Sequence, residues 1–161
     1  MLYHPFPPLY DDACKILILG SFPSVKSREQ QFFYGHPQNR FWKVTAAVFG
    51  EPVPETIPEK RTFLLRRHIA LWDVLAACEI TGSSDSSIRN AQPNDLTPIL
   101  TSAKIRQIFV NGGTAAKYYG KYQQKALNRT ALRLPSTSPA NAAWSLLRLT
   151  DAWSILREYT E

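Results

Sequence analysis

Residues 15–24 read KILILGSFPS, an apolar run with strand character that stops at Gly20 and leads into a short turn. Its apolar residues are continuous rather than alternating, which is typical of a strand covered on both faces in a parallel sheet. Further short apolar runs follow along the chain, and we expect each run to form one strand. The runs cover residues 15–19, 69–74, 105–110 and 132–134.

Helical patterns separate these runs, so that strands and helices alternate along the chain. Such alternation requires parallel crossovers and predicts an α/β fold, a three-layer α/β/α sandwich around one parallel sheet. Neither side of the proline-containing loop at residues 52–58 is large enough to fold alone, so we expect residues 1–161 to form a single domain. The expected helices cover residues 39–49, 59–67, 96–103, 114–126 and 142–159, the last with Trp144, Leu147, Ile155 and Tyr159 on one stripe.

The composition, with 44% hydrophobic and 20% charged residues, is that of a globular protein, and no apolar run is long enough to span a membrane. The N-terminus has neither a basic start nor an apolar core, so we expect no signal peptide and a cytoplasmic protein. The two cysteines, Cys14 and Cys78, cannot hold an iron–sulfur cluster, which needs four thiolates. Because no His, Cys and carboxylate residues group at ligand spacing, we expect no metal and no cofactor.

The net charge of +6 is unevenly distributed along the chain. Basic and acidic residues balance over residues 1–100, whereas residues 101–161 hold nine Lys or Arg and three Asp or Glu. A basic half attracts polyanions, since each phosphate contact releases condensed counterions. Nucleic acid is therefore a candidate partner, although many basic proteins bind none.

Small or polar residues end each of the four apolar runs. They are the turn at residues 20–24 (GSFPS), Asp73, residues 111–113 (NGG) and residues 136–138 (STS). In open parallel sheets, ligands bind beyond the carboxyl ends of the strands, so we expect these segments to converge on one cleft. The same residue types are common in ordinary strand-to-helix turns, and the pattern therefore predicts a site but not a reaction.

Residues 20–42 read GSFPSVKSREQQFFYGHPQNRFW, in which a Gly-x-x-Pro turn is followed by the block HPQNRFW at residues 36–42. This segment resembles the first motif of the uracil-DNA glycosylase superfamily, especially its mismatch-specific and hypoxanthine branches. The segment LPSTSPAN at residues 134–141 resembles the late Ser-rich loop of that superfamily and is most similar to the hypoxanthine branch. A weaker third match joins residues 71–73 with residues 89–96.

The resemblance implies a four-stranded parallel sheet in the order 2-1-3-4 and a monofunctional DNA glycosylase. Such an enzyme flips a deaminated base out of DNA and hydrolyses its glycosidic bond without cutting the strand. Hypoxanthine is the implied substrate and uracil a further one, and we expect a monomer that acts beside the nucleoid on DNA containing a deaminated base. Two alternatives stay open: a mismatch-specific uracil or thymine glycosylase, and a non-catalytic nucleic-acid-binding relative on the same fold.

The Gly-x-x-Pro turn departs from the mismatch-specific branch at its third position. That branch carries there the Asn that holds the attacking water, whereas this chain has Phe22. The hypoxanthine branch implies Asn39 as the catalytic residue instead, because an amide carbonyl can orient a water while its NH₂ group holds a substrate oxygen. The alternative is that Asn39 only caps the helix that begins at Arg40.

The resemblance also implies roles for residues around the base. Tyr34 is expected to stack on the extruded base, or else to belong to the core. Asp73 is expected to accept an N–H from the base edge, or else to cap a turn. His36 is expected to bond substrate or phosphate, or to serve as a buried structural partner, whereas His4 and His68 have no cluster partner. Ser21 and Phe22 complete the base-binding set.

The Ser-rich loop lacks the His that opens it in uracil-specific enzymes, with Leu134 and Pro135 in its place. Its hydroxyl and backbone N–H groups are then expected to clamp phosphates, which positions DNA without reading its sequence. Residues 140–142 (ANA) are expected to enter the base stack as a short wedge. The DNA-binding set is Ser24, Ser136, Thr137, Ser138 and Asn141.

Overall fold

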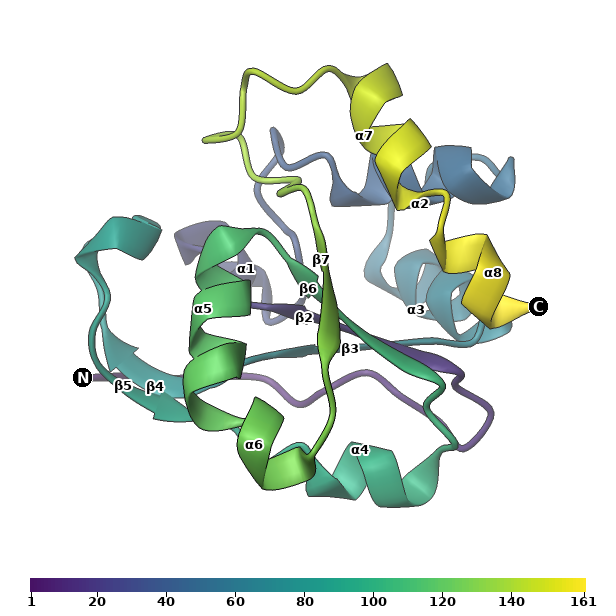
Figure 1. Cartoon of the computed structure of the whole chain (residues 1–161). Coiled ribbons are helices and arrows are strands. Elements are labelled where there is room, and N and C mark those ends of the chain that lie inside the picture. The colour runs from purple at the N-terminus through teal and green to yellow at the C-terminus, as the bar shows by residue number, and fades with distance from the viewer.

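A four-stranded parallel sheet lies at the centre of the computed structural model, which describes residues 1–161 (Figure 1). Its order is β3-β2-β6-β7, which confirms the expected order 2-1-3-4 of the apolar runs. The central strand β2 is paired on both sides and is buried throughout, as its continuous apolar sequence predicted. The strands are β2 (Ile16–Gly20), β3 (Ile69–Asp73), β6 (Gln107–Asn111) and β7 (Ala131–Leu134).

Helices cover both faces of this sheet, which confirms the three-layer α/β/α architecture. In Figure 1, one side carries α2 (Phe41–Phe49), α3 (Ile57–Arg66), α7 (Leu146–Trp153) and α8 (Leu156–Thr160). The other side carries α4 (Thr97–Ser102), α5 (Gly113–Tyr122) and α6 (Gln124–Leu127), and the short α1 (Val25–Gln30) follows the turn after β2. None of the helices combines the length and the apolar composition that a membrane crossing requires.

A second, antiparallel sheet is present that the sequence did not predict. It consists of β1 (Leu2–Tyr3), β4 (Leu75–Glu79) and β5 (Arg89–Pro93) in the order β1-β4-β5. The chain turns at Val74, directly after β3, and continues as β4. The side-chain amide of Asn94 holds this turn, because it donates to the carbonyls of Asp73 and Leu75 at 2.8 and 3.1 Å. Pairing with β4 then draws the N-terminal strand alongside the end of β3.

The helix predicted over residues 114–126 is interrupted at Gln123, which separates α5 from α6. The side chain of Gln123 is buried, and its amide donates to the carbonyls of Val74 and Asn94 at 3.0 and 2.8 Å. These long-range bonds tie the end of α5 to the turn between the two sheets, which explains why the helix does not continue.

The single helix predicted over residues 142–159 is wrong. Residues 142–145 form a loop, and Ser145 caps α7 by accepting the backbone N–H of Arg148 at 3.1 Å. The predicted apolar stripe is wrong as well, because Leu147 on α7 is 81% exposed. The stripe that packs on the core has helical spacing and consists of Leu149, Trp153 and Leu156, all fully buried.

Leu149→Ala is expected to lower the free energy of unfolding by about 2–5 kcal/mol, because it deletes a fully buried side chain and leaves a cavity. Leu147→Ala, on the same helix, is expected to change it by less than about 0.5 kcal/mol, because that side chain is exposed. Urea denaturation followed by circular dichroism measures both variants against the wild type. Equal losses in the two variants would contradict the buried stripe assigned to α7.

Candidate active site

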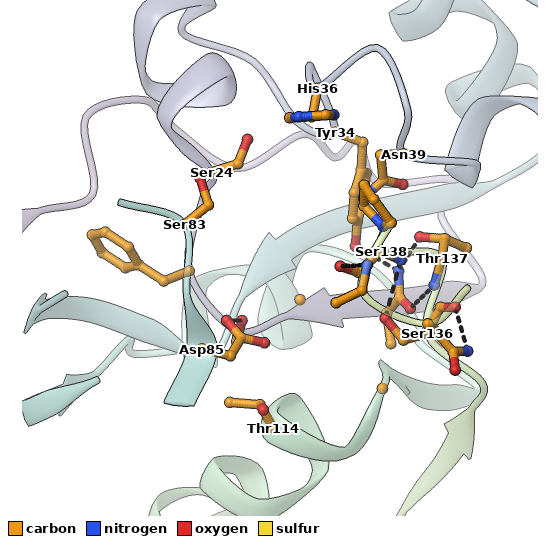
Figure 2. A pocket seen from close by; sticks show the side chains of 18 of the residues that line it. Ser24, Tyr34, His36, Asn39, Ser83, Asp85, Thr114, Ser136, Thr137 and Ser138 are labelled. Carbon is orange, nitrogen blue, oxygen red and sulfur yellow. Dashed lines mark hydrogen bonds between the residues drawn. The ribbon is translucent and has the colours of Figure 1, made fainter. Parts of the chain in front are cut away.

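A cleft of about 1060 Å³ opens at the carboxyl ends of the parallel strands (Figure 2). All the polar strand ends named from the sequence line it, which confirms that they converge on one place. Two further segments close its rim, the loop before α2 and the loop between β4 and β5. The volume is at the upper end of ordinary ligand pockets, about 300–1,000 Å³, and leaves room for a whole nucleotide.

The floor of the cleft is built around Gly20, the last residue of β2. A Cβ atom at this position would lie 2.5 Å from Oδ1 of Asp73 and 3.2 Å from the hydroxyl of Tyr34, so a larger residue would have to displace the carboxylate. Gly20 is the register partner of Asp73 on the neighbouring strand, which places the carboxylate beside the glycine. The missing side chain therefore allows a carboxylate and a phenol to meet at the cleft floor.

Asp73 is 4% exposed, and one of its two carboxylate oxygens is already bound. Nε2 of His4 donates to Oδ2 at 2.7 Å, although 69 positions separate the two residues in sequence. Oδ1, the oxygen nearest Gly20, has no hydrogen-bond partner in the protein. The sequence showed no cluster partner for His4 and did not reveal this pairing with Asp73. The side chain of Asp73 accepts no backbone N–H, so it does not cap a turn.

Tyr34 has a backbone φ of 51°, and its ring lines the cleft (Figure 2). One face of the ring stacks on Phe41, with a centroid distance of 4.1 Å and an interplanar angle of 13°. Burial and the negative charge of Asp73 raise the pKa of the Tyr34 hydroxyl, which therefore stays protonated. Nδ2 of Asn111 donates to this hydroxyl at 3.3 Å, so its own O–H remains free to donate. Tyr34 therefore packs on the core and also lines the cleft, two roles that were expected as alternatives.

Asn39 lies at the rim of the cleft, beside Tyr34 in Figure 2. Its Oδ1 accepts the backbone N–H of Phe41, the first residue of α2, at 3.0 Å. The N-cap of α2 is Arg40, and no side chain caps the helix, so this bond lies one residue before the cap that was expected as the alternative to a catalytic role. Its Nδ2 makes no hydrogen bond within the protein. Asn39 therefore stabilises the start of α2 and also contributes a free amide group to the cleft lining.

His36 lines the cleft at the same rim. Its Nδ1 accepts the backbone N–H of Gln38 at 3.1 Å, so the hydrogen of the neutral ring is on Nε2. No protein group occupies Nε2, which leaves it available as a donor. The Ser-rich loop offers no imidazole to the cleft, and the loop before α2 supplies one from the other side.

Asn111, at the end of β6, holds the Ser-rich loop against the sheet. Its Nδ2 donates to Oγ1 of Thr137 at 3.0 Å, and its Oδ1 accepts the backbone N–H of Thr137 at 3.1 Å. Thr137 is fully buried, so its hydroxyl cannot contact a phosphate and the expectation for this residue is wrong. The only sequence signal for Asn111 was its position after a predicted strand, which did not reveal this partner.

Ser136, Ser138 and Asn141 shape a turn within the Ser-rich loop. Oγ of Ser136 accepts the backbone N–H of Ser138 at 3.1 Å, and Nδ2 of Asn141 donates to the carbonyl of Ser136 at 2.9 Å. All three residues line the cleft, as the sequence predicted. The amide of Asn141 is occupied by the loop itself, whereas Ala140 and Ala142 on either side of it are exposed.

Arg40, the residue directly before α2, supports this loop through hydrogen bonds. Its guanidinium donates to the carbonyl oxygens of Asn141 and Trp144, and its backbone N–H donates to the carbonyl of Thr137. From the other side, Arg148 of α7 lies over the ring of Trp144, 3.8 Å from guanidinium carbon to ring centroid. The projecting tip of the loop is therefore supported at both of its ends.

The loop at residues 82–87 forms the opposite wall of the cleft. Oγ of Ser21 donates to Oδ1 of Asp85 at 3.0 Å, which links this wall to the turn after β2. Burial of the carboxyl raises the pKa of Asp85, and the charge of Asp73 acts in the same direction. In the same turn, Phe22 is 8% exposed, and Ser24 caps α1 by accepting the backbone N–H of Ser27 at 3.1 Å.

The structure contains no group of three or more His, Cys, Asp or Glu side chains that could hold a metal ion.

Only part of the positive charge of the second half of the chain lies near the cleft. Arg133, at the end of β7, lines the cleft beside Gly113. Arg106 and Arg129 lie just before β6 and β7 and therefore at the amino ends of the strands, away from the cleft. There they donate to carbonyl groups of Glu161 and Ile105. A ligand in the cleft can therefore contact fewer basic side chains than the second half of the chain contains.

Known proteins share these features. The family model of the uracil DNA glycosylase superfamily matches residues 7–158. A hypoxanthine DNA glycosylase of Methanosarcina acetivorans is 34% identical over 159 residues, which are 98% of this chain and 99% of the relative. A hypoxanthine DNA glycosylase of Methanosarcina barkeri is 33% identical over 115 residues, which are 70% of this chain and 73% of the relative.

A solved structure shows the same fold. The solution NMR structure of a protein from Methanosarcina acetivorans, provisionally described as a uracil DNA glycosylase, superposes with a TM-score of 0.84. The sequence identity is 32%, and the match covers 100% of both chains. Family model, full-length relatives and fold agree, and the chain belongs to the uracil-DNA glycosylase superfamily.

Proposed function

We propose that this protein is a monofunctional DNA glycosylase that removes hypoxanthine from DNA. The observation that carries the proposal is the free Oδ1 of Asp73 at the cleft floor, next to the protonated hydroxyl of Tyr34. Two relatives named hypoxanthine DNA glycosylase support the same substrate. The enzyme acts as a monomer in the cytoplasm, where the nucleoid supplies DNA that contains deaminated bases.

The two groups at the floor match the edge of hypoxanthine. Hypoxanthine presents N1–H beside the acceptor O6, whereas adenine presents a bare N1 beside an NH₂ group. A carboxylate only accepts hydrogen bonds, so Asp73 accepts N1–H while Tyr34 donates to O6. Adenine in the same position sets its N1 lone pair against the carboxylate and its NH₂ group against the phenolic O–H. The site thereby rejects the parent base from which hypoxanthine is formed.

In this arrangement Tyr34 meets the edge of the extruded base through its hydroxyl rather than through a ring face, and Phe41 covers one face of the ring. Ser136 and Ser138 contact the phosphates, and the exposed tip at residues 140–142 enters the space that the base leaves.

Hydrolysis breaks the bond between N9 of the base and C1′ of the sugar. The electron pair of that bond leaves with the base, and a water oxygen adds to C1′ and releases a proton that neutralises the base. Asn39 holds the water through the lone pair of Oδ1 that the Phe41 N–H does not use. No lysine lines the cleft, so no amine is placed to form a Schiff base and cut the strand.

Duplexes that each carry one hypoxanthine, uracil, thymine opposite guanine, or adenine in a labelled strand test this proposal. After incubation with the protein in excess chelator, alkali is expected to cleave the hypoxanthine strand and leave the adenine strand intact. Without alkali no strand is cut. Because uracil presents N3–H beside a carbonyl, slower release of uracil is also expected.

Three other outcomes have a clear meaning. Cleavage restricted to uracil or thymine opposite guanine would favour the mismatch-specific alternative. Binding of all duplexes without release of any base would favour a non-catalytic relative. Loss of activity in chelator, with recovery on adding a divalent cation, would contradict the metal-free reaction.

Asn39→Ala is expected to lower the single-turnover rate of hypoxanthine release by on the order of 10²- to 10³-fold, the usual effect of losing one positioned transition-state hydrogen bond. The variant also loses the acceptor for the Phe41 N–H, which costs about 1 kcal/mol of stability. Asn39→Ser is the matched control, because a serine hydroxyl can accept this N–H but has no NH₂ group to hold a substrate oxygen. It is expected to melt close to the wild type and to release the base more slowly than the wild type. If Asn39→Ala melts early but releases the base at a normal rate, Asn39 only stabilises the start of α2.

Because Arg133 is the basic residue of the second half of the chain that lines the cleft, we propose that it contacts a phosphate, and the salt dependence of DNA binding tests this contact. Arg133→Gln is expected to reduce the slope of log K against log salt by about 0.9, the contribution of one phosphate contact on duplex DNA. Lys104→Gln is the control, because Lys104 is exposed and precedes β6 at the opposite edge of the sheet. Fluorescence anisotropy with a labelled duplex measures both slopes. Equal slopes for the wild type and Arg133→Gln would show that Arg133 contacts no phosphate.

A further inference from the structure

We infer that His4 is a positioning residue of the base site, which holds Asp73 in the orientation that turns its free oxygen to the base edge. The inference rests on the proposed function. It adds a residue that lies outside the motifs of the cleft and 69 positions before its partner.

The contact between His4 and Asp73 is short and shielded from water. Nε2 and Oδ2 lie 2.7 Å apart, and the two side chains are 3% and 6% exposed. No other protein group bonds the carboxylate. Without the Nε2–H donor, Oδ2 would be an unpaired buried acceptor on a charged group, which costs more than an ordinary hydrogen bond contributes. The rotamer of Asp73 therefore depends on His4.

Aromatic rings hold the imidazole in place. Nδ1 of His4 has no partner, so the ring is oriented by packing and by Asp73 alone. Four rings surround it, with centroid distances from 4.3 to 6.4 Å, and they belong to Phe6, Phe22, Phe33 and Trp72. This enclosure leaves His4 no alternative position from which it could release Oδ2.

The second sheet fixes both partners of the contact. The backbone N–H of His4 donates to the carbonyl of Ala76 at 2.8 Å, directly after β1 pairs with β4. β4 begins two residues after Asp73, so the same short stretch of chain holds the carboxylate and the strand that delivers the imidazole. This gives the antiparallel sheet, which lies outside the three-layer core, a role in the site.

His4→Phe removes the donor and retains an aromatic ring for its neighbours, whereas His4→Gln places an amide N–H near the position of Nε2. Carbon-13 NMR of the Asp73 carboxyl group reports the hydrogen bonding of this group in each variant, independently of catalysis. In His4→Phe the carboxyl resonance is expected to move, because Oδ2 loses its donor. The single-turnover rate of hypoxanthine release is expected to fall by about 10- to 100-fold, the equivalent of one hydrogen bond to a charged group, and His4→Gln is expected to restore both.

An unchanged Asp73 carboxyl resonance in His4→Phe would overturn the inference, whatever the activity. A normal rate of hypoxanthine release in His4→Phe would also overturn it, because a ring that acts only through packing is replaced by phenylalanine. If the wild type releases no hypoxanthine while the carboxyl resonance still moves in His4→Phe, the proposed function fails and the contact between His4 and Asp73 is upheld. Circular dichroism melting confirms that each variant is folded during the measurements.

Discussion

The missing side chain at Gly20 is the constraint on which the rest of the site depends. β2 and β3 run in parallel register, so Gly20 and Asp73 end side by side, and a Cβ on Gly20 would lie 2.5 Å from the carboxylate. Only glycine lets this carboxylate and the hydroxyl of Tyr34 share one floor. Both groups lie where water is largely excluded, so their hydrogen bonds to a base are stronger than they would be in solvent.

Aromatic packing connects this floor to the core of the protein. Tyr34 stacks on Phe41, and Phe41 meets the edge of the Trp153 ring at a centroid distance of 5.7 Å. The indole N–H of Trp153 in turn donates to the carbonyl of Pro135 at 2.9 Å. The ring whose hydroxyl is assigned to the base edge and the loop assigned to phosphate contacts therefore share one buried support, which keeps both in place before a ligand arrives.

Several side chains at the cleft use one polar atom for structure and leave another free. Oδ1 of Asn39 accepts the backbone N–H of Phe41 while its Nδ2 is free, and Nδ1 of His36 accepts a backbone N–H while its Nε2 is free. Asp73 follows the same pattern, with Oδ2 bound by His4 and Oδ1 free. Each group is thus oriented before substrate binds, which lowers the entropy that binding must remove. Substitutions here affect stability and chemistry together unless the structural bond is retained.

The sequence by itself determined the parallel sheet and the location of the cleft, because buried strands and the small polar residues after them are local patterns. It did not reveal β5, whose sequence RNAQP has no apolar alternation. It also did not reveal that residues 142–145 form a loop and that α7 begins only after its cap, Ser145. The tertiary structure alone decided the contacts of Asp73 with His4 and of Asn111 with Thr137, across 69 and 26 positions. Such bonds depend on which strands lie side by side, and this neighbourhood exists only once the whole chain has folded.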